Sequence, residues 1–582
     1  MAFSEIKRRP AVALNFRSDL HPVLQRVYAA RGVLRSEDLD LSLDRLLPVR
    51  SLPGVEAAAE LLLEHRRGRV LVIGDFDADG ATSSALMVRA LRSLQFSHVD
   101  FLVPNRFRFG YGLTPEIVAL AVTRQPTLMV TVDNGVSSIE VVAAARAAGI
   151  PVLVTDHHLP GAALPDAHVI VNPNMAPCGI GSTPNPLGPT FGSTALAGVG
   201  VAFYVVAALA RRIGESRFRA ADLLDLVALG TVADVVPLDH NNRILVAQGL
   251  RRIRAGRCAP GIRALLESGG RILDRVTAAD LGFVAGPRLN AAGRLTDMSV
   301  GIACLLSDDP AAATQLAGQL ARLNVERREI EQRMQDEAVE IARSLRFNGA
   351  GDEALGLCLF DDGWHEGVVG LVAGNIKDRL HRPVIAFART ENGALRGSAR
   401  SVAGVHIRDV LDSIAARHPG LIDKFGGHAM AAGVSLAEQS LDVFRGAFAA
   451  EIARRAGLES LRGIVHSDGE LSAAELCVTT ARALQCAGPW GQGFPEPVFD
   501  ARFEIDDARI VGGRHLKLKL RTVTPERCSE PIDAIAFGYL GGPAEDPELR
   551  AGAIAHLAFR LEVNEYRGEE RMQLNCQYLH RV

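Results

Sequence analysis

Short apolar runs alternate with amphipathic segments along the first part of the chain. The apolar runs are rich in Val, Leu, Ile and Phe, and they lie at 70–76, 99–104, 128–133 and 151–156. The segments between them carry apolar residues at helical spacing and lie at 80–94, 114–122 and 137–149. Strands separated by helices of this length predict a parallel sheet that is covered by helices on both faces.

A longer helical pattern follows at 311–346. Apolar residues recur there every three or four positions, with Arg327 as the only polar member: Leu316, Leu320, Leu323, Ile330, Met334, Ala338, Ile341 and Leu345. Because such a stripe has to pack against something, we expect this helix to connect two domains. Apolar runs at 354–360 and 383–388 predict strands of a second α/β domain.

After about residue 462 the pattern changes to strict alternation. Residues 514–521 read RHLKLKLR, which places the leucines on one face of a strand and the basic residues on the other. This predicts a small β domain in the form of a barrel. The expected organisation is an N-terminal segment packing on the core (1–50), an α/β domain (51–310), the connecting helix (311–346), a second α/β domain (347–458) and the β-barrel (459–582).

The composition narrows the class of protein. The 582 residues carry 64 Lys and Arg against 67 Asp and Glu, a net charge of −3, and 48% of them are hydrophobic. These values exclude a disordered chain and a surface that is basic throughout, so any nucleic-acid surface has to be a local patch. Aromatic residues make up 5%, so we do not expect a large base-stacking surface.

The cysteines and the apolar segments indicate the compartment. The eight cysteines form no CxxC pair and are too sparse for a disulfide scaffold, so we expect reduced thiols in a cytoplasmic protein. Pro10 and Asn15 interrupt the N-terminal apolar run, which makes a poor signal peptide. The apolar segment at 194–210 is shorter than the about 20 residues of a membrane-spanning helix, and we expect a buried helix there.

Ionisable residues follow three of the predicted parallel strands where each strand ends. They are Asp75, Asp77 and Asp79 after the first strand, Asp133 after the third, and Asp156, His157 and His158 after the fourth. Because ligands of open parallel sheets bind beyond the carboxyl ends of the strands, we expect these side chains to converge on one site. Asp234 follows an apolar helix in GTVADVVPLD and could reach the same place.

The residue types in this cluster favour a metal site. Clustered carboxylates repel one another and take up protons unless a cation neutralises them. Oxygen and imidazole ligands without thiolate favour Mn²⁺ or Mg²⁺ over structural Zn²⁺, and two such ions suit phosphoester hydrolysis. Each piece alone has another interpretation: DFDADG as a turn or a Ca²⁺ loop, TVDNG as an Asx turn, and the histidine pair as a cap. Their position at three strand ends favours the metal site.

These residues lie in motifs that resemble those of the DHH phosphoesterases. The four motifs are DFDADGATS, TVDNG, TDHHLP and GTVADVVPL. Supporting motifs resemble more specifically the RecJ family of single-strand-specific exonucleases: NRF–GYGL (105–113), LAGVGVAFY (196–204), GPRLNAAGRL (286–295), WHEGVVG (364–370), GSARS (397–401), FGGHAMAAG (425–433) and GPWGQGFPEP (488–497). The resemblance covers nearly the whole chain and implies a DHH domain, a DHHA1-type domain and an OB-like barrel, which shorter superfamily members lack.

The resemblance also implies roles for the clustered residues. It makes Asp77, Asp79, Asp133, His157 and Asp234 ligands of two divalent metal ions, Mn²⁺ or Mg²⁺, with Asp75 as an assisting acid at the first. It places His158 at the scissile phosphate, and it makes Asp156 an outer residue that orients the histidines, as is usual around metal-bound imidazole.

The activity that the resemblance implies is 5′→3′ degradation of single-stranded DNA to mononucleotides, in recombination and repair. This activity needs a groove that is too narrow for a duplex and has cationic side chains along the path of the strand. Arg288, Arg294, Arg396 and Arg400 are candidates for these cations, with Ser398 as a hydrogen-bond donor. The resemblance places His428 near the reaction centre, although a structural histidine between glycines is the alternative. Lys517 and Lys519 share a strand face with His515 and Arg521; this face either tracks phosphates or is a solvated edge.

Two other functions remain open. One is a phosphatase or nanoRNase for very short oligonucleotides, and the other is a non-catalytic nucleic-acid-binding scaffold. A monomer is expected, with single-stranded DNA as substrate, a single-strand-binding protein and a RecQ-type helicase as partners, and no membrane association.

Two departures from the family pattern, Arg108-Phe109 and Ala399, bear on substrate contacts.

Overall fold

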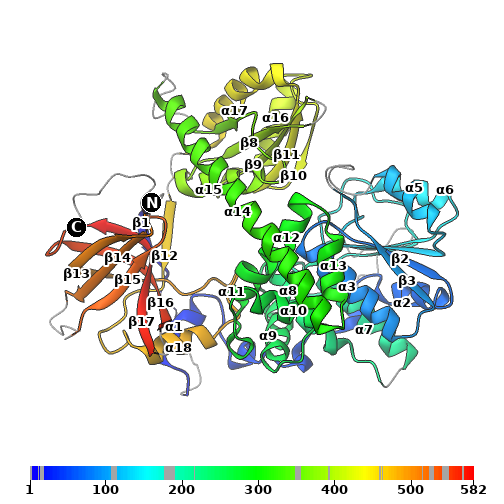
Figure 1. Cartoon of the computed structure of the whole chain (residues 1–582), viewed down its shortest axis with the longest axis horizontal. Helices are drawn as coiled ribbons and strands as arrows, with labels where there is room; N and C mark the ends of the chain where they lie inside the picture. Colours follow the sequence, from blue (N-terminus) through cyan, green and yellow to red (C-terminus); the bar gives the residue numbers. More distant parts are fainter. Residues whose placement is uncertain are drawn as a thin grey trace. The chain divides into compact units, whose positions relative to one another are not determined.

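The computed structural model describes residues 3–10, 12, 19–105, 114–175, 191–214, 217–347, 355–390, 393–457, 461, 463–513, 515–523, 530–539, 550–566 and 569–582. The chain divides into two compact units, whose elements are labelled in Figure 1. The first unit consists of Val33–Val325 and Cys486–Glu496. The second consists of Met1–Gly32, Glu326–Gln485 and Pro497–Val582.

A five-stranded parallel sheet organises the first unit. Its strands are β2 (Arg69–Ile73), β3 (His98–Leu102), β4 (Leu128–Val132), β5 (Val152–Thr155) and β6 (Val169–Val171), in the order β3-β2-β4-β5-β6. Every neighbouring pair is parallel, and all residues of β4 and β5 are buried. Burial on both faces explains why these strands read as continuous apolar runs. The predicted parallel α/β sheet is confirmed.

Helices connect the strands and continue the first unit beyond the sheet (Figure 1). Those next to the strands are α2 (Val55–Glu64), α3 (Ala78–Ser93), α5 (Pro115–Thr123) and α6 (Ile139–Ala147). The later ones are α7 (Gly198–Ile213), α8 (Leu224–Ala233), α9 (His240–Arg254), α10 (Pro260–Glu267), α11 (Ala278–Asp280), the π-helical turn η6 (Leu281–Ala285), α12 (Gly286–Leu295) and α13 (Ser299–Leu306). Helices α3, α7 and α8 pack on one another and surround the end of the sheet where the acidic residues lie.

The apolar segment at 194–210 overlaps helix α7, which begins at Gly198, ends at Ile213 and is buried in the first unit. Val201, Val205 and Leu209 have no solvent exposure. The described part of the chain contains no helix that is long and apolar enough to cross a membrane. The expectation of a buried helix is therefore confirmed.

Helix α14 (Pro310–Phe347) runs from the first unit into the second, because the division between the units falls at Val325 and Glu326. The predicted connecting helix is thus present. Of the predicted stripe, Leu320, Met334 and Ala338 are fully buried. The other apolar members whose side chains are described are half-buried, because the small residues beside them, such as Ala317, face the interior instead. The side chain of Leu345 lies outside the described part.

The second unit contains a mixed five-stranded sheet. Its strands are β7 (Leu357–Phe360), β8 (Val384–Arg389), β9 (Leu395–Arg400), β10 (Lys424–Gly427) and β11 (Ala431–Leu436), in the order β10-β11-β9-β8-β7. Strands β7 and β8 are parallel and the other pairs are antiparallel. The accompanying helices are α15 (Val369–Leu380), α16 (Ile407–Arg417) and α17 (Leu441–Arg455).

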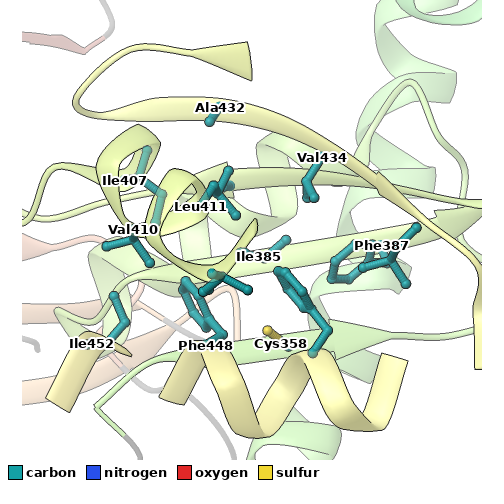
Figure 2. Close-up of a cluster of buried hydrophobic side chains, with 14 of the residues drawn as sticks. Cys358, Ile385, Phe387, Ile407, Val410, Leu411, Ala432, Val434, Phe448 and Ile452 are labelled. Carbon is teal, nitrogen blue, oxygen red and sulfur yellow. The ribbon is translucent and has the colours of Figure 1, made fainter. Parts of the chain in front are cut away.

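The core of this second α/β domain lies between the sheet and helices α16 and α17. Figure 2 shows side chains that converge from these elements, including Phe387 of β8, Leu411 of α16 and Phe448 of α17. Phe387 packs edge-to-face on Phe444 with the ring centroids 5.7 Å apart. Fully buried aromatic rings contribute the largest apolar area per residue, so this cluster stabilises the domain independently of the first unit.

A closed five-stranded barrel forms the C-terminal part of the second unit. Its strands are β13 (Phe499–Val511), β14 (His515–Thr522), β15 (Ile532–Ala536), β16 (Ile554–Tyr566) and β17 (Glu569–Arg581), in the order β13-β14-β15-β17-β16. Leu516, Leu518 and Leu520 of β14 point inward and are buried. Lys519 between them is exposed. The alternation that the sequence predicts for this strand is confirmed.

The N-terminal segment does not behave as one piece. Strand β1 (Phe3–Arg8) pairs in parallel with β12 (Gly463–Ser467), and α1 (Pro22–Ala29) belongs to the same unit, which also includes α18 (Val478–Cys486). Arg31 bonds Asp468 through both carboxylate oxygens, with both side chains 1% exposed. Residues 1–32 thus join the second unit, whereas we had expected 1–50 to pack on the core as one segment. Backbone pairing of a short strand leaves no sequence periodicity from which to predict it.

Glu451 provides a test of the packing of α17. Its carboxylate is 3% exposed and accepts hydrogen bonds from Arg454 and Arg455, and Arg417 lies 3.5 Å away. The hydrogen bonds from Arg454 lower the pKa of Glu451 from 4.5 to about 2. A carboxylate whose pKa is lowered in the folded state stabilises the fold above its unfolded pKa and loses this contribution as the pH falls toward the folded value.

We therefore expect Glu451→Gln to lower the free energy of unfolding by about 1–3 kcal/mol at pH 7. The deficit should shrink as the pH falls from 4.5 toward 2, and urea unfolding at several pH values measures it. Glu438→Gln is the control, because the Glu438 carboxylate is 42% exposed and its pair with Arg389 is worth about 0–1 kcal/mol. A deficit that does not depend on pH would contradict the assignment.

Candidate metal centre

The acidic residues lie where the parallel strands end. Asp75, Asp77 and Asp79 follow β2, Asp133 follows β4, and Asp156 with the two histidines follows β5. Asp133 adopts the left-handed conformation (φ 63°), which Asp tolerates better than most residues. Asp234 is the C-terminal cap residue of α8 and reaches the same cluster from outside the sheet. The expected convergence is what the structure shows.

His157 lies at the centre of this cluster. Its Nε2 is 3.1 Å from Oδ1 of Asp133, 3.5 Å from Oδ2 of Asp234 and 4.0 Å from Oδ2 of Asp79. Two overlapping groups, Asp79–His157–Asp234 and Asp133–His157–His158, each bring their potential ligand atoms within 4.8 Å of one another. The described residues therefore include two sets of donors around one imidazole, each compact enough to hold a cation.

The N-terminus of α7 fixes the carboxylate of Asp79. Oδ2 accepts a hydrogen bond from the backbone N–H of Gly198 at 2.6 Å, and Oδ1 accepts one from Val199 at 3.0 Å. Amides at a helix N-terminus favour negative charge. A Cβ on Gly198 would lie 2.6 Å from Cβ of Asp133, and one on Gly230 would lie 2.8 Å from Oδ1 of Asp79. The small residues in LAGVGVAFY and GTVAD thus allow the carboxylates to approach.

The first acidic loop is held by its own helix and by α12. Asp77 caps α3 by accepting a hydrogen bond from Gly80 N–H at 2.9 Å. Asn290 of α12 accepts one from Ala78 N–H at 2.8 Å. A Cβ on Gly293 would lie 1.8 Å from the carbonyl oxygen of Phe76, so α12 contacts the loop directly. Asn290 is a supporting residue that sequence reasoning missed; its motif was recognised, but its spacing indicates no contact.

Asp156 hydrogen bonds to both histidines of the pair. Its Oδ1 lies 2.7 Å from Nδ1 of His158 and accepts hydrogen bonds from the backbone N–H groups of both histidines, while Oδ2 accepts one from Val136 N–H. Burial lowers the pKa of His158, but the hydrogen bond with Asp156 and the neighbouring carboxylates raise it to about 9. His158 is therefore a cation at neutral pH, and 44% of its side chain is exposed.

His157 has the opposite electrostatic character. Burial, and then the charge of His158, lower its pKa to about 4, so the ring is neutral at pH 7. One ring nitrogen hydrogen bonds to the backbone of Leu196, and Nε2 is buried without a hydrogen-bond partner. A neutral imidazole held by a backbone contact with its other nitrogen free is the form that binds a metal ion.

The carboxylates around His157 are strained electrostatically. Burial and the charge of Asp77 raise the pKa of Asp79 to about 7. Burial and the neighbouring acids raise the pKa values of Asp133 and Asp234 well above their usual range. Oδ1 of Asp133 is also buried without a hydrogen-bond partner. Repelling carboxylates, an orphaned oxygen and an orphaned imidazole nitrogen fit a divalent cation of the Mn²⁺ or Mg²⁺ type.

Apart from Lys517 and Lys519 of β14, the residues predicted to contact DNA lie in three places. Arg288 and Arg294 lie on α12, where Arg288 donates a hydrogen bond to Val284 O at 2.7 Å. Arg396, Ser398 and Arg400 share one face of β9, where Arg396 pairs with Glu366 at 3.0 Å and Arg400 donates to Ser398 at 2.8 Å. His428 is exposed in the turn between β10 and β11.

The basic face of β14 is partly neutralised by its neighbours. Lys519 lies 3.7 Å from Asp533, and Arg521 pairs with Asp506 at 2.7 Å. Lys517 is half-buried on the same face. Phe537, which is 59% exposed and packs against His515, adds an aromatic surface that the alternation pattern did not reveal. Ala399 is fully buried in β9, while Arg108-Phe109 lie outside the described residues.

Three family models match the chain. They are the N-terminal domain of the DHH family over residues 69–231, the DHHA1 domain over 353–454 and the RecJ OB domain over 467–578. They coincide with the parallel-sheet domain, the mixed-sheet domain and the barrel. The predicted fold class is therefore confirmed in all three parts.

Relatives match over the whole chain. The single-stranded-DNA-specific exonuclease RecJ of Dickeya dadantii is 50% identical over 588 aligned residues, covering 99% of both chains. That of Escherichia coli is 49% identical over 568, covering 96% of this chain and 95% of the relative. The crystal structure of RecJ in complex with Mn²⁺ from Thermus thermophilus, 31% identical, has a TM-score of 0.77 and covers 97% of this chain and 76% of that chain. The chain thus belongs to the RecJ family of single-stranded-DNA-specific exonucleases, within the DHH superfamily of hydrolases.

Proposed function

We propose that this chain is a metal-dependent exonuclease that degrades single-stranded DNA from the 5′ end to mononucleotides. The observation that carries the proposal is the group of carboxylates of Asp79, Asp133 and Asp234 around Nε2 of His157. A relative has been solved with Mn²⁺ and again with Mg²⁺, and the donors of this chain suit either ion. Bound cations would supply Lewis-acid activation of the scissile phosphate and neutralise the negative charge that develops on it.

Some residues of the cluster are proposed to bind the cations and others to bind the substrate. We assign Asp77, Asp79, Asp133, His157 and Asp234 as ligands of two ions, with Asp75 assisting at the first. His158, cationic and exposed beside the cluster, is placed to hydrogen-bond a phosphate oxygen. Asp156 acts through His158 by fixing its ring and its charge.

The path of the DNA strand is proposed from the remaining basic and polar side chains. We propose that Arg288, Arg294, Arg396, Ser398 and Arg400 contact phosphates along the strand, that His428 contacts a phosphate near the reaction centre, and that Lys517 and Lys519 track the strand on the barrel. Support comes from the shared face of β9, where Ser398 pairs in register with Gly433 of β11. Gly433 is exposed and nothing lies within 4 Å of the position that a Cβ on it would take, so a ligand can approach the backbone there.

The cellular role extends the same proposal. Degradation of single strands fits recombination and repair in the cytoplasm, where a single-strand-binding protein and a RecQ-type helicase would expose or present the substrate. We propose that the chain acts as a monomer.

Asp133→Asn should separate metal binding from fold stability. Because burial and repulsion raise the pKa of Asp133, its charged form destabilises the metal-free fold at pH 7, and the amide removes that charge while tolerating the left-handed backbone. We expect Tm without metal to rise by about 2–4 °C, and the further rise on adding Mn²⁺ to be lost. Asp166→Asn, at a carboxylate 83% exposed, should change neither value. An unchanged Mn²⁺ response in Asp133→Asn would refute the site.

Activity and polarity can be measured on end-labelled strands. We expect the protein with Mn²⁺ to release a 5′ label at once as a mononucleotide, while a 3′ label stays on progressively shorter fragments and is released last. His157→Ala should lower kcat at least about 100-fold, because it removes the central donor of both groups. Release of the 3′ label first would reverse the polarity, and turnover confined to dinucleotides would favour the short-oligonucleotide activity.

The barrel contacts can be tested through salt dependence. In a His157→Ala background, which prevents digestion, Lys517→Ala and Lys519→Ala should each reduce the slope of log affinity against log salt by about 0.7. Lys377→Ala is the control, because Lys377 pairs with Asp378 on α15. Slopes that equal that of the control would exclude the barrel face from the strand path.

A further inference from the structure

The segment Cys486–Glu496 is separated from its flanks in the fold. The residues on both sides of it belong to the second unit, but the segment itself belongs to the first. It contains most of the GPWGQGFPEP motif, to which the metal centre assigns no role. We name this segment the strap.

The strap packs on the loop that follows Asp234. The backbone N–H of Leu238 donates a hydrogen bond to the carbonyl oxygen of Gln492 at 2.7 Å. A Cβ on Gly491 would lie 2.7 Å from Cδ1 of Leu238, and Gly493, at φ 72°, approaches Pro237. These contacts reach the loop three and four residues beyond Asp234.

Aromatic packing anchors the strap. Phe494 is 4% exposed and stacks on Trp490 with the ring centroids 5.2 Å apart and the planes at 13°. The guanidinium of Arg243 from α9 also lies over the ring of Phe494, 4.3 Å from its centroid. Arg243 is itself buried and donates a hydrogen bond to the carbonyl oxygen of Asp38. A buried cation–π contact of this kind fixes the strap against α9.

The loop that the strap covers is conformationally strained. Val235, the residue directly after Asp234, has φ 62°, which is rare for a β-branched residue, and it is 63% exposed. Because the side chain of Val235 is exposed, its packing does not explain the strained backbone conformation. The loop is held at its far end by the Gln492 contact and by Asn242, which donates to Pro237 O at 2.9 Å. Strained residues persist only where their surroundings over-determine them.

The carboxylate of Asp234 is repelled by the neighbouring acids. The charges of Asp79 and Asp77 repel the Asp234 carboxylate, which is 22% exposed. We propose that the strap is a positioning element: it holds the Asp234 loop in its strained form, so that the carboxylate stays among the donors around His157. The inference rests on the proposed role of Asp234 as a metal ligand, and it identifies Phe494 and Trp490 as positioning residues for that ligand.

A double-mutant cycle on Mn²⁺ affinity tests the strap. Affinity is measured on the full chain by electron paramagnetic resonance of free Mn²⁺, without substrate. We expect Phe494→Ala to weaken Mn²⁺ binding by about 10-fold or more, as the loss of supporting contacts around metal ligands does. In an Asp234→Asn background the same substitution should have no further effect, because the ligand that the strap positions is already lost.

The control is Phe96→Ala, at a phenylalanine of the same unit that is 6% exposed and follows α3 just before β3. It should lower Tm but leave Mn²⁺ affinity unchanged. If Phe494→Ala does not fold, Gly491→Ala, which presses a methyl group on Leu238, is used in the same cycle and interpreted in the same way.

The outcomes distinguish the two proposals. An equal loss of affinity with Phe494→Ala in both backgrounds, no loss at all, or a loss that Phe96→Ala reproduces, would overturn the strap and leave the metal centre intact. Unchanged Mn²⁺ affinity in the Asp234→Asn single variant would instead overturn the assignment of Asp234 as a ligand.

Discussion

Mutual repulsion between buried carboxylates is the constraint on which the rest of this structure depends. Asp79, Asp133 and Asp234 surround one imidazole nitrogen at distances of 3.1 to 4.0 Å, and burial together with like charge raises the pKa of each. Left to themselves, such groups separate or bind protons. A site that is ready for divalent cations has to oppose both tendencies with contacts that do not neutralise the charge.

The supporting contacts follow from that requirement. Backbone amides of α7 bond Asp79, the amide of Gly80 bonds Asp77, and Asn290 accepts from the backbone beside them, so each fixes a position without adding a competing cation. Asp156 stabilises the positive charge of His158, and burial together with that charge lowers the pKa of His157 and keeps its ring neutral. Asp234 is the C-terminal cap residue of α8, and we infer that its position depends on the loop that follows it.

The sequence predicted those parts of the site whose positions follow from the order of strands and helices. Ionisable residues at the ends of parallel strands must meet, because the carboxyl ends of those strands lie on one edge, and alternation in β14 fixed the face on which Lys519 lies. It could not predict Asn290, which acts 212 positions from Ala78, or the amides of α7, which have no residue-type signature. The pairing of β1 with β12 was missed for the same reason: long-range backbone contacts leave no local pattern.

The partly neutralised β14 face clarifies how a chain of net charge −3 can act on a polyanion. Phosphate binding at Lys519 and Arg521 has to compete with Asp533 and Asp506, so each contact contributes little net free energy. In the metal centre, bound cations would relieve the repulsion between the carboxylates and would in turn attract phosphate. In the proposed function, the binding energy would then be concentrated at the reacting end of the strand. That distribution suits an exonuclease, because contacts spread evenly along the substrate would tighten binding without favouring the transition state.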